Sequence, residues 1–462
     1  MDTKALRQKI LDLAIHGKLV PQDPNDEPAS VLLERIRAEK ERLIKEGKIK
    51  KGKKSAKTSD KPHYPFELPK GWCFTNIGEL LINRDGERKP VSSAIRSKQL
   101  NKIYDYYGAA GVIDKIDDYL FDEKLLLIGE DGANLLSKSK NNAFFAEGKY
   151  WVNNHAHVLD ATDKNLLEYV AIVINAIKLD DYITGSAQPK LSQDNLNKIP
   201  IVLPPLSEQK RIMEAIIHWS LLIEQIEQNK IDLQASIKQA KSKVLDLAIH
   251  GKLVQQDPND EPASELLKRI NPKAEIITDN GHYQKLPEGW TICKLKDICS
   301  KLVDGDHNPP KGTKETTEYL MLSAQNIVND NIVYTNGVRY LNHDTFETSD
   351  KRTKVMQGDL LITIVGTLGR SCVFSDNKKI TLQRSVACLT PLIYNHFLKY
   401  YMDSSSIQKY MTTNAKGTAQ KGFYLNQLEQ LPIMIPPLTE QQRIVARIEK
   451  IFARLDVIES AL

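Results

Sequence analysis

The segment LDLAIHGKLV occupies residues 11–20 and recurs, identical at every position, at residues 245–254. The segment QDPNDEPAS at residues 22–30 returns with the same offset at residues 256–264. Matched segments that recur in a fixed order predict an internal duplication, in which one structural frame is used twice.

Two further pairs of segments mark the borders of each copy. HYPFELPKGW (residues 63–72) is similar to HYQKLPEGW (residues 282–290). PPLSEQKRI (residues 204–212) is similar to PPLTEQQRI (residues 436–444). Between these borders the two copies differ widely. A duplicated enzyme would keep its reactive residues in both copies, whereas a protein that recognises two different ligands keeps the frame and varies the contents.

The two variable segments nevertheless share a coarse order of predicted elements. Each has an apolar strand (residues 125–128; 360–365), a second strand (150–159; 380–389), a helix (165–177; 396–411), a Gly-x-Ala-Gln loop and a last strand before Pro-Pro. This irregular succession of strands and helices predicts an α+β fold with two globular mixed domains.

A long helix is predicted after Pro205, which suits a helix start, and it is expected to stop at Gly251. Its apolar residues alternate spacings of four and three, with one polar break at Lys230, as in a helix that supercoils against a partner. The predicted seam consists of Ile212, Ile216, Trp219, Ile223, Ile226, Leu233, Ile237, Val244 and Leu247.

The second copy begins the same helix shortly before the chain ends. Its seam residues are Ile444, Ile448, Ile451, Leu455 and Ile458, and the spacing continues at the N-terminus with Leu6, Ile10 and Leu13. We therefore expect two long antiparallel coiled-coil helices related by a pseudo-two-fold axis, with one globular domain at each end. The second helix would be assembled from both chain ends.

Five parts follow from this frame. Residues 1–62 form an N-terminal helix and a basic linker, residues 63–205 the first variable domain, and residues 206–281 a central region with the long spacer helix. Residues 282–437 form the second variable domain. Residues 438–462 form a spacer helix that pairs with the central helix and continues toward the N-terminal one.

Composition excludes several classes of protein. The first ten residues lack the apolar region of a secretory signal, and no apolar run is long enough to span a bilayer. The formal net charge of +5 is weak support for DNA binding, because a basic run at residues 35–62 accounts for it. Five cysteines form no CxxC pair and no ligand-spaced set with histidine, so we expect free thiols in the cytoplasm.

The repeated LDLAIHGKLV and QDPNDEPAS segments, the ELPKGW and KLPEGW domain openings, and the PPLSEQKRI and PPLTEQQRI helix starts together resemble the specificity subunit of type I restriction–modification systems. The resemblance covers essentially the whole chain. It implies that residues 63–205 and 282–437 are target-recognition domains. Each would read one half of a split, asymmetric target in double-stranded DNA, while the helices set the unread gap.

The resemblance also implies partners. Two modification subunits would dock on the repeated helical regions and methylate adenine with S-adenosylmethionine. Restriction subunits would supply translocation and cleavage driven by ATP with Mg²⁺. This chain would then be a non-catalytic scaffold with no cofactor, metal or active site of its own.

Base reading requires side-chain donors and acceptors that reach groove edges, together with cations on phosphates. An ordinary solvated loop is the competing interpretation for any one such residue. In the first domain the candidates are Arg84, Arg88, Lys89, Lys138, Lys140, Asn153, Asn154, Gln188 and Lys190. In the second domain they are His307, Asn308, Lys311, Gln325, Asn326, Arg370, Gln383, Arg384, Gln420 and Lys421.

Two other classes of protein compete with this interpretation. A self-contained DNA methyltransferase or nuclease would need its own signature. Asn308-Pro309-Pro310-Lys311 resembles the (N/D)PP(Y/F) motif of amino-methyltransferases, but Lys311 replaces the aromatic residue and no glycine-rich cofactor loop follows a strand. We interpret this segment as a turn. A coiled-coil adaptor without DNA contact would leave two large, diverged domains unexplained.

Overall fold

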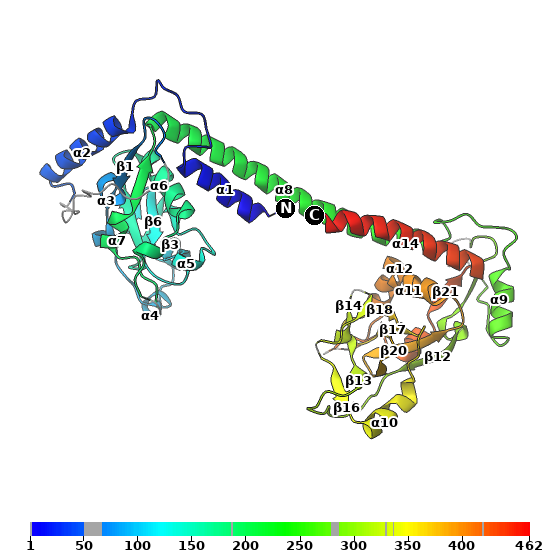
Figure 1. The fold of residues 1–462 in the computed structure, drawn as a ribbon. Helices are drawn as coiled ribbons and strands as arrows, with labels where there is room; N and C mark the ends of the chain where they lie inside the picture. Colours follow the sequence, from blue (N-terminus) through cyan, green and yellow to red (C-terminus); the bar gives the residue numbers. More distant parts are fainter. Residues whose placement is uncertain are drawn as a thin grey trace. The chain divides into compact units, whose positions relative to one another are not determined.

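The computed structural model describes residues 2–49, 67–185, 188–278, 286–328, 330–335, 337–417 and 420–462. The chain divides into two compact units, Met1–Asn229 and Lys230–Leu462. Each unit has a mixed domain of strands and short helices attached to a helical frame (Figure 1). The expected α+β fold with an internal repeat is therefore confirmed.

The domain of the first unit contains two four-stranded sheets. One has the strand order β2-β9-β6-β7 with antiparallel neighbours, and the other has the order β4-β3-β8-β5, in which β3 and β8 are parallel. Helix α6 (Lys164–Ala176) packs against β6 and β7. The strands are β2 (Ile82–Asn83), β3 (Tyr104–Gly108), β4 (Gly111–Ile116), β5 (Phe121–Asp122), β6 (Leu125–Gly129), β7 (Ala143–Ala146), β8 (Lys149–Val152) and β9 (Ala156–Asp160).

The domain of the second unit repeats this topology. One sheet has the order β12-β20-β17-β18, and the other has the order β16-β13-β19, with β13 and β19 again parallel. A hairpin of β14 and β15 and the helix α10 (His343–Thr353) are added. The strands are β12 (Cys299–Asp304), β13 (Tyr319–Leu322), β14 (Ile327–Val328), β15 (Asn331–Ile332), β16 (Arg339–Leu341), β17 (Leu360–Thr363), β18 (Ser371–Val373), β19 (Lys379–Leu382) and β20 (Val386–Pro391).

The central strands explain how two diverged sequences form one topology. All five residues of β6 and all four residues of β17 are buried, as expected for a short apolar run covered on both faces of a sheet. Each domain is closed by an antiparallel pair that brings its two borders together. These pairs are β1 (Cys73–Asn76) with β10 (Pro200–Leu203), and β11 (Thr291–Lys294) with β21 (Pro432–Ile435).

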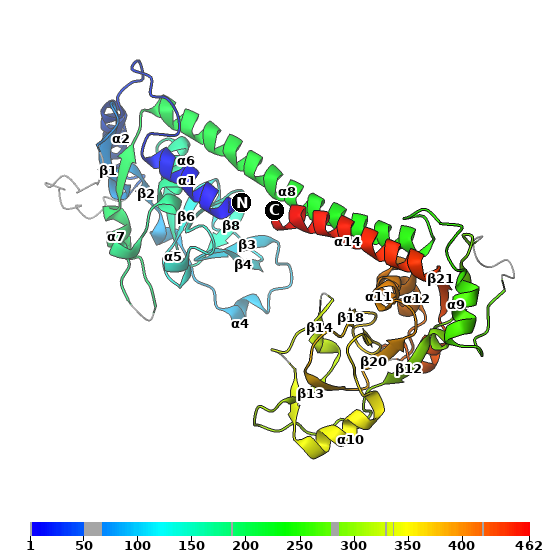
Figure 2. The same cartoon turned by 45° about the vertical axis from the view of Figure 1, so that its right-hand side comes forward.

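The long helix α8 (Leu206–Ile249) runs without a break, as the heptad pattern predicts. In the first unit α1 (Thr3–Ile15) lies antiparallel to its first part, where Arg7 pairs with Glu227 at 3.1 Å (Figures 1 and 2). In the second unit α14 (Leu438–Ser460) lies antiparallel to its last part, where Lys241 pairs with Glu459 at 2.9 Å. The two ion pairs occupy matching positions of the repeat.

A clamp around a buried glutamate holds each domain to its frame, and in the first unit it consists of Gln22, Trp72 and Glu208. Trp72 Nε1 donates to Glu208 Oε2 at 2.9 Å, and Gln22 Nε2 donates to Glu208 Oε1 at 3.3 Å. Burial raises the pKa of Glu208 above the ordinary glutamate value, although the two donors lower it. The second unit repeats the clamp with Gln256, Trp290 and Glu440, whose carboxyl pKa burial also raises.

The predicted helix seam is buried only in part. Buried positions are Ile212, Ile223, Ile237, Ile444, Ile448 and Ile10, and partly buried ones are Ile216, Val244, Leu247, Ile451, Leu455, Leu6 and Leu13. Four predicted seam residues are exposed instead: Trp219, Ile226, Leu233 and Ile458. A pair of helices without a third layer covers only one side of each seam residue, so large side chains stay in contact with solvent.

Two predicted strands are wrong in the same way. The segment 150–159 was expected as one strand, but it forms β8 in one sheet and β9 in the other, and the segment 380–389 likewise forms β19 and β20. The polar residues 153–155 and 383–385 connect the two strands in each domain and lead the chain from one sheet to the other. The helix expected at 396–411 is also divided, into α11 (Asn395–Asp403) and α12 (Ser405–Thr413), at the extended residue Ser404.

Several other predictions have a definite outcome. Asn308 and the two prolines after it lie in the loop between β12 and β13, in agreement with a turn. All five cysteines are free thiols. Among the described residues no helix is long and apolar enough to cross a membrane. The domain openings at His63 and His282, and the second half of the basic run, lie outside the described residues.

Candidate nucleic-acid interface

Loops gather at the end of the central strand in each domain, and we call this surface the loop edge. In the first domain three backbone hydrogen bonds build it: from Asn153 N to Tyr107 O (3.1 Å), from Glu130 N to His155 O (2.8 Å) and from Leu191 N to Glu130 O (2.7 Å). They join loops that are far apart in the sequence. The loop edge of the first domain comprises residues 84–89, 107–111, 130–142, 153–155 and 188–191, of which all are described.

The loop edge of the second domain is built by the same three bonds. Gln383 N donates to Leu322 O (2.8 Å), Ile364 N to Ser385 O (2.9 Å) and Phe423 N to Ile364 O (2.8 Å). The structure therefore brings together candidates that the sequence places in separate segments. This loop edge comprises residues 305–311, 322–326, 364–370, 383–385 and 420–423.

Most of the predicted contacts are exposed on these edges. In the first domain the exposed candidates are Lys89, Lys140, Asn154, Gln188 and Lys190. In the second they are His307, Asn308, Lys311, Gln325, Arg370, Arg384, Gln420 and Lys421, with Gln383 half-buried. These side chains offer amide donors and acceptors for base edges and cations for phosphates.

Two predicted arginines are committed to carboxylates of their own domain. Arg84 forms hydrogen bonds with Glu87 (2.6 Å) and Glu123, and Arg88 with Glu130 (2.7 Å). Their side chains are 22% and 13% exposed, respectively, so little of either guanidinium group faces solvent. Both arginines join segments of the fold, and their charge is balanced before DNA arrives.

Three further candidates have structural roles. Lys138 Nζ donates to the carbonyl oxygens of Asn175 (3.2 Å) and Ile177 at the C-terminal end of α6. Asn153 is buried, and its Oδ1 accepts the backbone N–H of His155 at 2.8 Å. Asn326 is fully buried and belongs to a capping box around Ser323. Buried amides with internal partners do not reach a base, so Asn153 and Asn326 leave the set of candidate base contacts.

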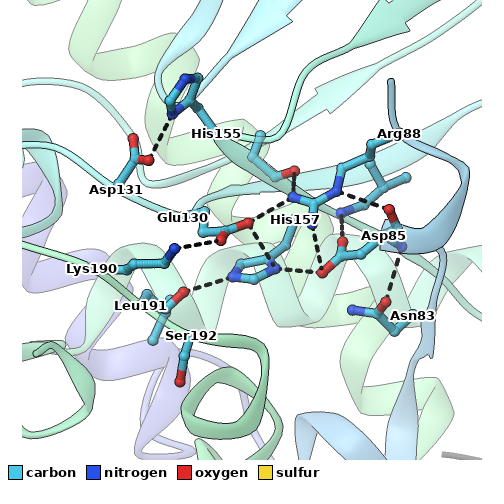
Figure 3. Close-up of polar contacts among 12 residues, drawn as sticks. Asn83, Asp85, Arg88, Glu130, Asp131, His155, His157, Lys190, Leu191 and Ser192 are labelled. Carbon is cyan, nitrogen blue, oxygen red and sulfur yellow. Dashed lines mark hydrogen bonds and ion pairs between the residues drawn. The ribbon is translucent and has the colours of Figure 1, made fainter. Parts of the chain in front are cut away.

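Beneath the first loop edge lies a compact ion network (Figure 3). His157, 1% exposed, faces Asp85 Oδ2 at 2.7 Å with Nδ1 and the carbonyl oxygen of Leu191 at 2.8 Å with Nε2. Burial would raise the pKa of Asp85, but the hydrogen bond and charge of His157 and the charge of Arg88 hold it below the usual aspartate value.

The oxygen and nitrogen atoms of Asp85, Glu130 and His157 lie close enough together to hold a metal ion. Arg88, however, contacts both carboxylates, with Nη1 2.7 Å from Glu130 and Nη2 3.4 Å from Asp85, and Lys190 lies 3.3 Å from Glu130 (Figure 3). The carboxylate charges are thus compensated by side chains. The chemistry of this donor set is that of a buried ion network which holds loops in place.

A cation that the sequence analysis missed lies beside the second loop edge. Arg352, about half exposed at the C-terminal end of α10, donates to the carboxylate and the backbone oxygen of Asp304. Helix α10 follows a segment that has no matched counterpart in the first domain. The repeat therefore gave no signal for this residue, and only the packing of α10 against β12 places it here.

Comparisons with known proteins agree with this architecture. The family model described as "Type I restriction modification DNA specificity domain" matches residues 69–237 and 287–461, which include both domains. The EcoEI specificity subunit of Escherichia coli is 27% identical over 542 residues, which cover 99% of this chain and 90% of the relative. The EcoAI specificity subunit of Escherichia coli is 32% identical over 376 residues, which cover 64% of this chain and 62% of the relative.

A solved structure has the same fold. A chain from a structure concerned with complex assembly and conformational transition of the type I restriction–modification system has a TM-score of 0.50 at 16% identity, over 86% of this chain and 94% of that chain. The HsdS subunit from Thermoanaerobacter tengcongensis has a TM-score of 0.49 at 16% identity, over 86% and 93%. On the family match to both domains, the chain belongs to the DNA specificity subunits of type I restriction–modification systems, a non-catalytic family that recognises the DNA target.

Proposed function

We propose that each loop edge reads one half of a split, asymmetric DNA target. The observation that carries this proposal is that two domains of one topology present different exposed side chains at the same place. The second edge offers His307, Asn308, Arg370 and Arg384, whereas the first offers Asn154, Gln188 and three lysines. Different donors and acceptors on one scaffold favour different base sequences.

In the same proposal the exposed cations of both edges lie on phosphates. Lys89, Lys140 and Lys190 serve the first half of the target, and Lys311, Lys421 and Arg384 serve the second. Contacts of this kind fix the position of a protein on the duplex, while amides and histidine at the edge select the bases.

We propose further that the repeated frame binds partners. Two modification subunits, each with S-adenosylmethionine, dock on the frame, one per unit, and restriction subunits that use ATP and Mg²⁺ join the complex in the cytoplasm. Support comes from the frame itself, since the clamp and the ion pairs along α8 are repeated residue by residue. Two matching surfaces favour two copies of one partner.

Domain exchange tests the reading of half-sites. Residues 63–205 are replaced by the same domain of a relative that has a different target, and the genome of the host is sequenced for methylated positions. The expected result is a change in one half of the modified motif, with the other half unchanged. A change in both halves, or in neither, contradicts the proposal.

A purified chain separates this function from that of a self-contained methyltransferase. With labelled S-adenosylmethionine and cognate DNA, the chain alone is expected to transfer no label, and addition of the modification subunit is expected to restore transfer. Methylation by the chain alone would favour the competing hypothesis.

A further inference from the structure

The buried network beneath the first loop edge ties three segments of the domain to one histidine. His157 is in β9, Asp85 lies in the loop after β2, and Leu191 follows the loop that carries Gln188 and Lys190. Two of these segments carry candidate DNA contacts, but His157 itself is 1% exposed. It therefore acts on DNA only through the loops that it holds.

Both nitrogens of this ring face oxygen acceptors, a carboxylate on one side and a backbone carbonyl on the other. A neutral imidazole has one N–H donor, whereas a doubly protonated ring donates to both acceptors. The other charged groups around it are Glu130, with an oxygen 3.9 Å from Nδ1, and Arg88 (Figure 3). The ring is buried, while Asp85, Glu130 and Arg88 are half-buried.

Neighbouring groups extend the network to the surface. Arg88 Nη1 also donates to the carbonyl oxygen of Ala156 at 2.6 Å, and Asp85 Oδ1 accepts the N–H of Val158 at 2.8 Å, so the loop after β2 is fixed along β9. On the exposed side Lys190 pairs with Glu130, and His155 pairs with Asp131 at 2.6 Å (Figure 3). The buried charges thus hold the positions of exposed side chains.

The second domain lacks this histidine at the matching position. In the first domain His157 lies opposite Ile128 on the central strand, and in the second Ala387 lies opposite Ile362. The position of Glu130 is taken by Ile364, which makes the equivalent backbone bonds. The ion network is therefore a property of one reader only, and any effect of its disruption falls on one half of the target.

We propose that His157 is a positioning residue for the first reader, whose imidazole holds the loops at residues 84–89 and 188–191 in the geometry that discriminates the first half-site. When one of its two hydrogen bonds is lost, a loop is released. Discrimination of the first half-site then weakens while that of the second is unchanged. The inference rests on the proposed function of the first domain.

The test uses the full chain in complex with its modification subunit, and duplexes that carry one substituted base pair in either half of the target found by methylome sequencing. His157→Gln, which keeps a donor for only one acceptor, is expected to lower first-half discrimination about tenfold, because one charge-assisted hydrogen bond is lost. Second-half discrimination is expected to stay within about twofold of the wild type, since those contacts lie in the other unit.

A matched variant controls for stability. Tyr169→Phe removes a buried hydrogen bond of 2.7 Å to Val202 O in the same domain, outside the residues of the loop edge. It is expected to keep first-half discrimination. If Tyr169→Phe loses as much discrimination as His157→Gln at a similar unfolding temperature, general destabilisation explains the effect and the inference is overturned.

Equal first-half discrimination by His157→Gln and the wild type overturns the inference alone. A wild-type complex that modifies no split motif overturns the proposed function and the inference together.

Discussion

At the scale of single residues, an exposed cation and a cation that is paired within the protein contribute differently to DNA binding. Lys421 is exposed on the second loop edge, whereas the guanidinium of Arg84 contacts Glu87, Glu123 and Asp160. A cation that is already balanced by carboxylates releases few counterions from DNA.

Salt dependence distinguishes the two kinds of residue. In the assembled complex, Lys421→Gln is expected to reduce the slope of log affinity against log salt concentration by about 0.9, because one phosphate contact is lost. Arg84→Gln is expected to leave this slope unchanged and to lower the unfolding temperature. Fluorescence anisotropy at several salt concentrations measures both slopes, and an equal loss in the two variants would count against the assignment.

An aspartate of the frame makes stability depend on pH. The hydrogen bond from Arg211 (2.6 Å) lowers the pKa of Asp26 below its ordinary value despite burial. A carboxyl group whose pKa is lowered by folding stabilises the folded state above its unfolded pKa of about 3.9, and this stability is lost as the pH falls through the folded value.

The prediction concerns the difference in free energy of unfolding between the wild type and a variant without the arginine. Arg211→Gln is expected to lower the free energy of unfolding at neutral pH, and the gap to the wild type should shrink below about pH 4 as Asp26 becomes protonated. Urea unfolding at a series of pH values measures the gap. Arg443→Gln, which breaks the matching pair with Asp260 in the second unit, is the companion variant and should behave alike. A gap that does not vary with pH would contradict the assignment.

The residue types in the sequence predicted well which loops are exposed. They predicted less well which side chains in those loops are available for contact with DNA. Loops rich in Asn, Lys and Arg do meet at the loop edges, as the candidates required. The partners of Arg84 and Arg88 are distant, however: Glu123 and Glu130 lie on or beside β6, more than thirty positions along the chain. No local pattern indicates such a pairing, because it is formed only when the sheet is formed.

At the scale of elements, continuous periodicity was predictable and the path between sheets was not. Pro205 predicted the start of α8 and Gly251 its end, and the heptad spacing predicted a continuous helix between them. In contrast, residues 150–159 alternate like one strand, and only tertiary pairing reveals that β8 joins β3 while β9 joins β6. A strand pattern states which residues favour extended backbone, but not which neighbour they pair with.

The continuity of α8 leads to a prediction about the unread gap in the target. An insertion of seven residues within residues 226–237 adds two helical turns, keeps the heptad seam, and lengthens the helix by about 10 Å, or about three base pairs. Methylome sequencing is expected to show a longer gap with both half-sites unchanged. An insertion of four residues breaks the seam and is expected to reduce modification. An unchanged gap with full activity would contradict the spacer role.

At the scale of the whole molecule, the two units are closed by separate copies of one clamp. Trp72 and Trp290 each donate to a buried glutamate within their own unit. Removing one donor leaves a buried carboxyl oxygen without that partner, which costs on the order of 1–3 kcal/mol. The frame is therefore divided into two parts whose stability is set locally.

Hydrogen exchange measures this independence. Trp72→Phe is expected to accelerate amide exchange in β1, β10 and the start of α8, and to leave β11 and β21 as they are in the wild type. Trp290→Phe is expected to do the reverse. Faster exchange in both units from a single substitution would show that the clamps are coupled.

The clamp also imposes an order on synthesis. Its three members in the first unit, Gln22, Trp72 and Glu208, are far apart in the chain, so Gln22 and Trp72 lack their shared acceptor until the start of α8 has left the ribosome. At that moment the second set has not been translated, and the correct partner is the only one available. Two nearly identical clamps in one polypeptide would otherwise exchange members, as repeated domains do when they misassemble. Vectorial translation removes this ambiguity, whereas refolding from denaturant restores it and is expected to give a lower yield of native protein.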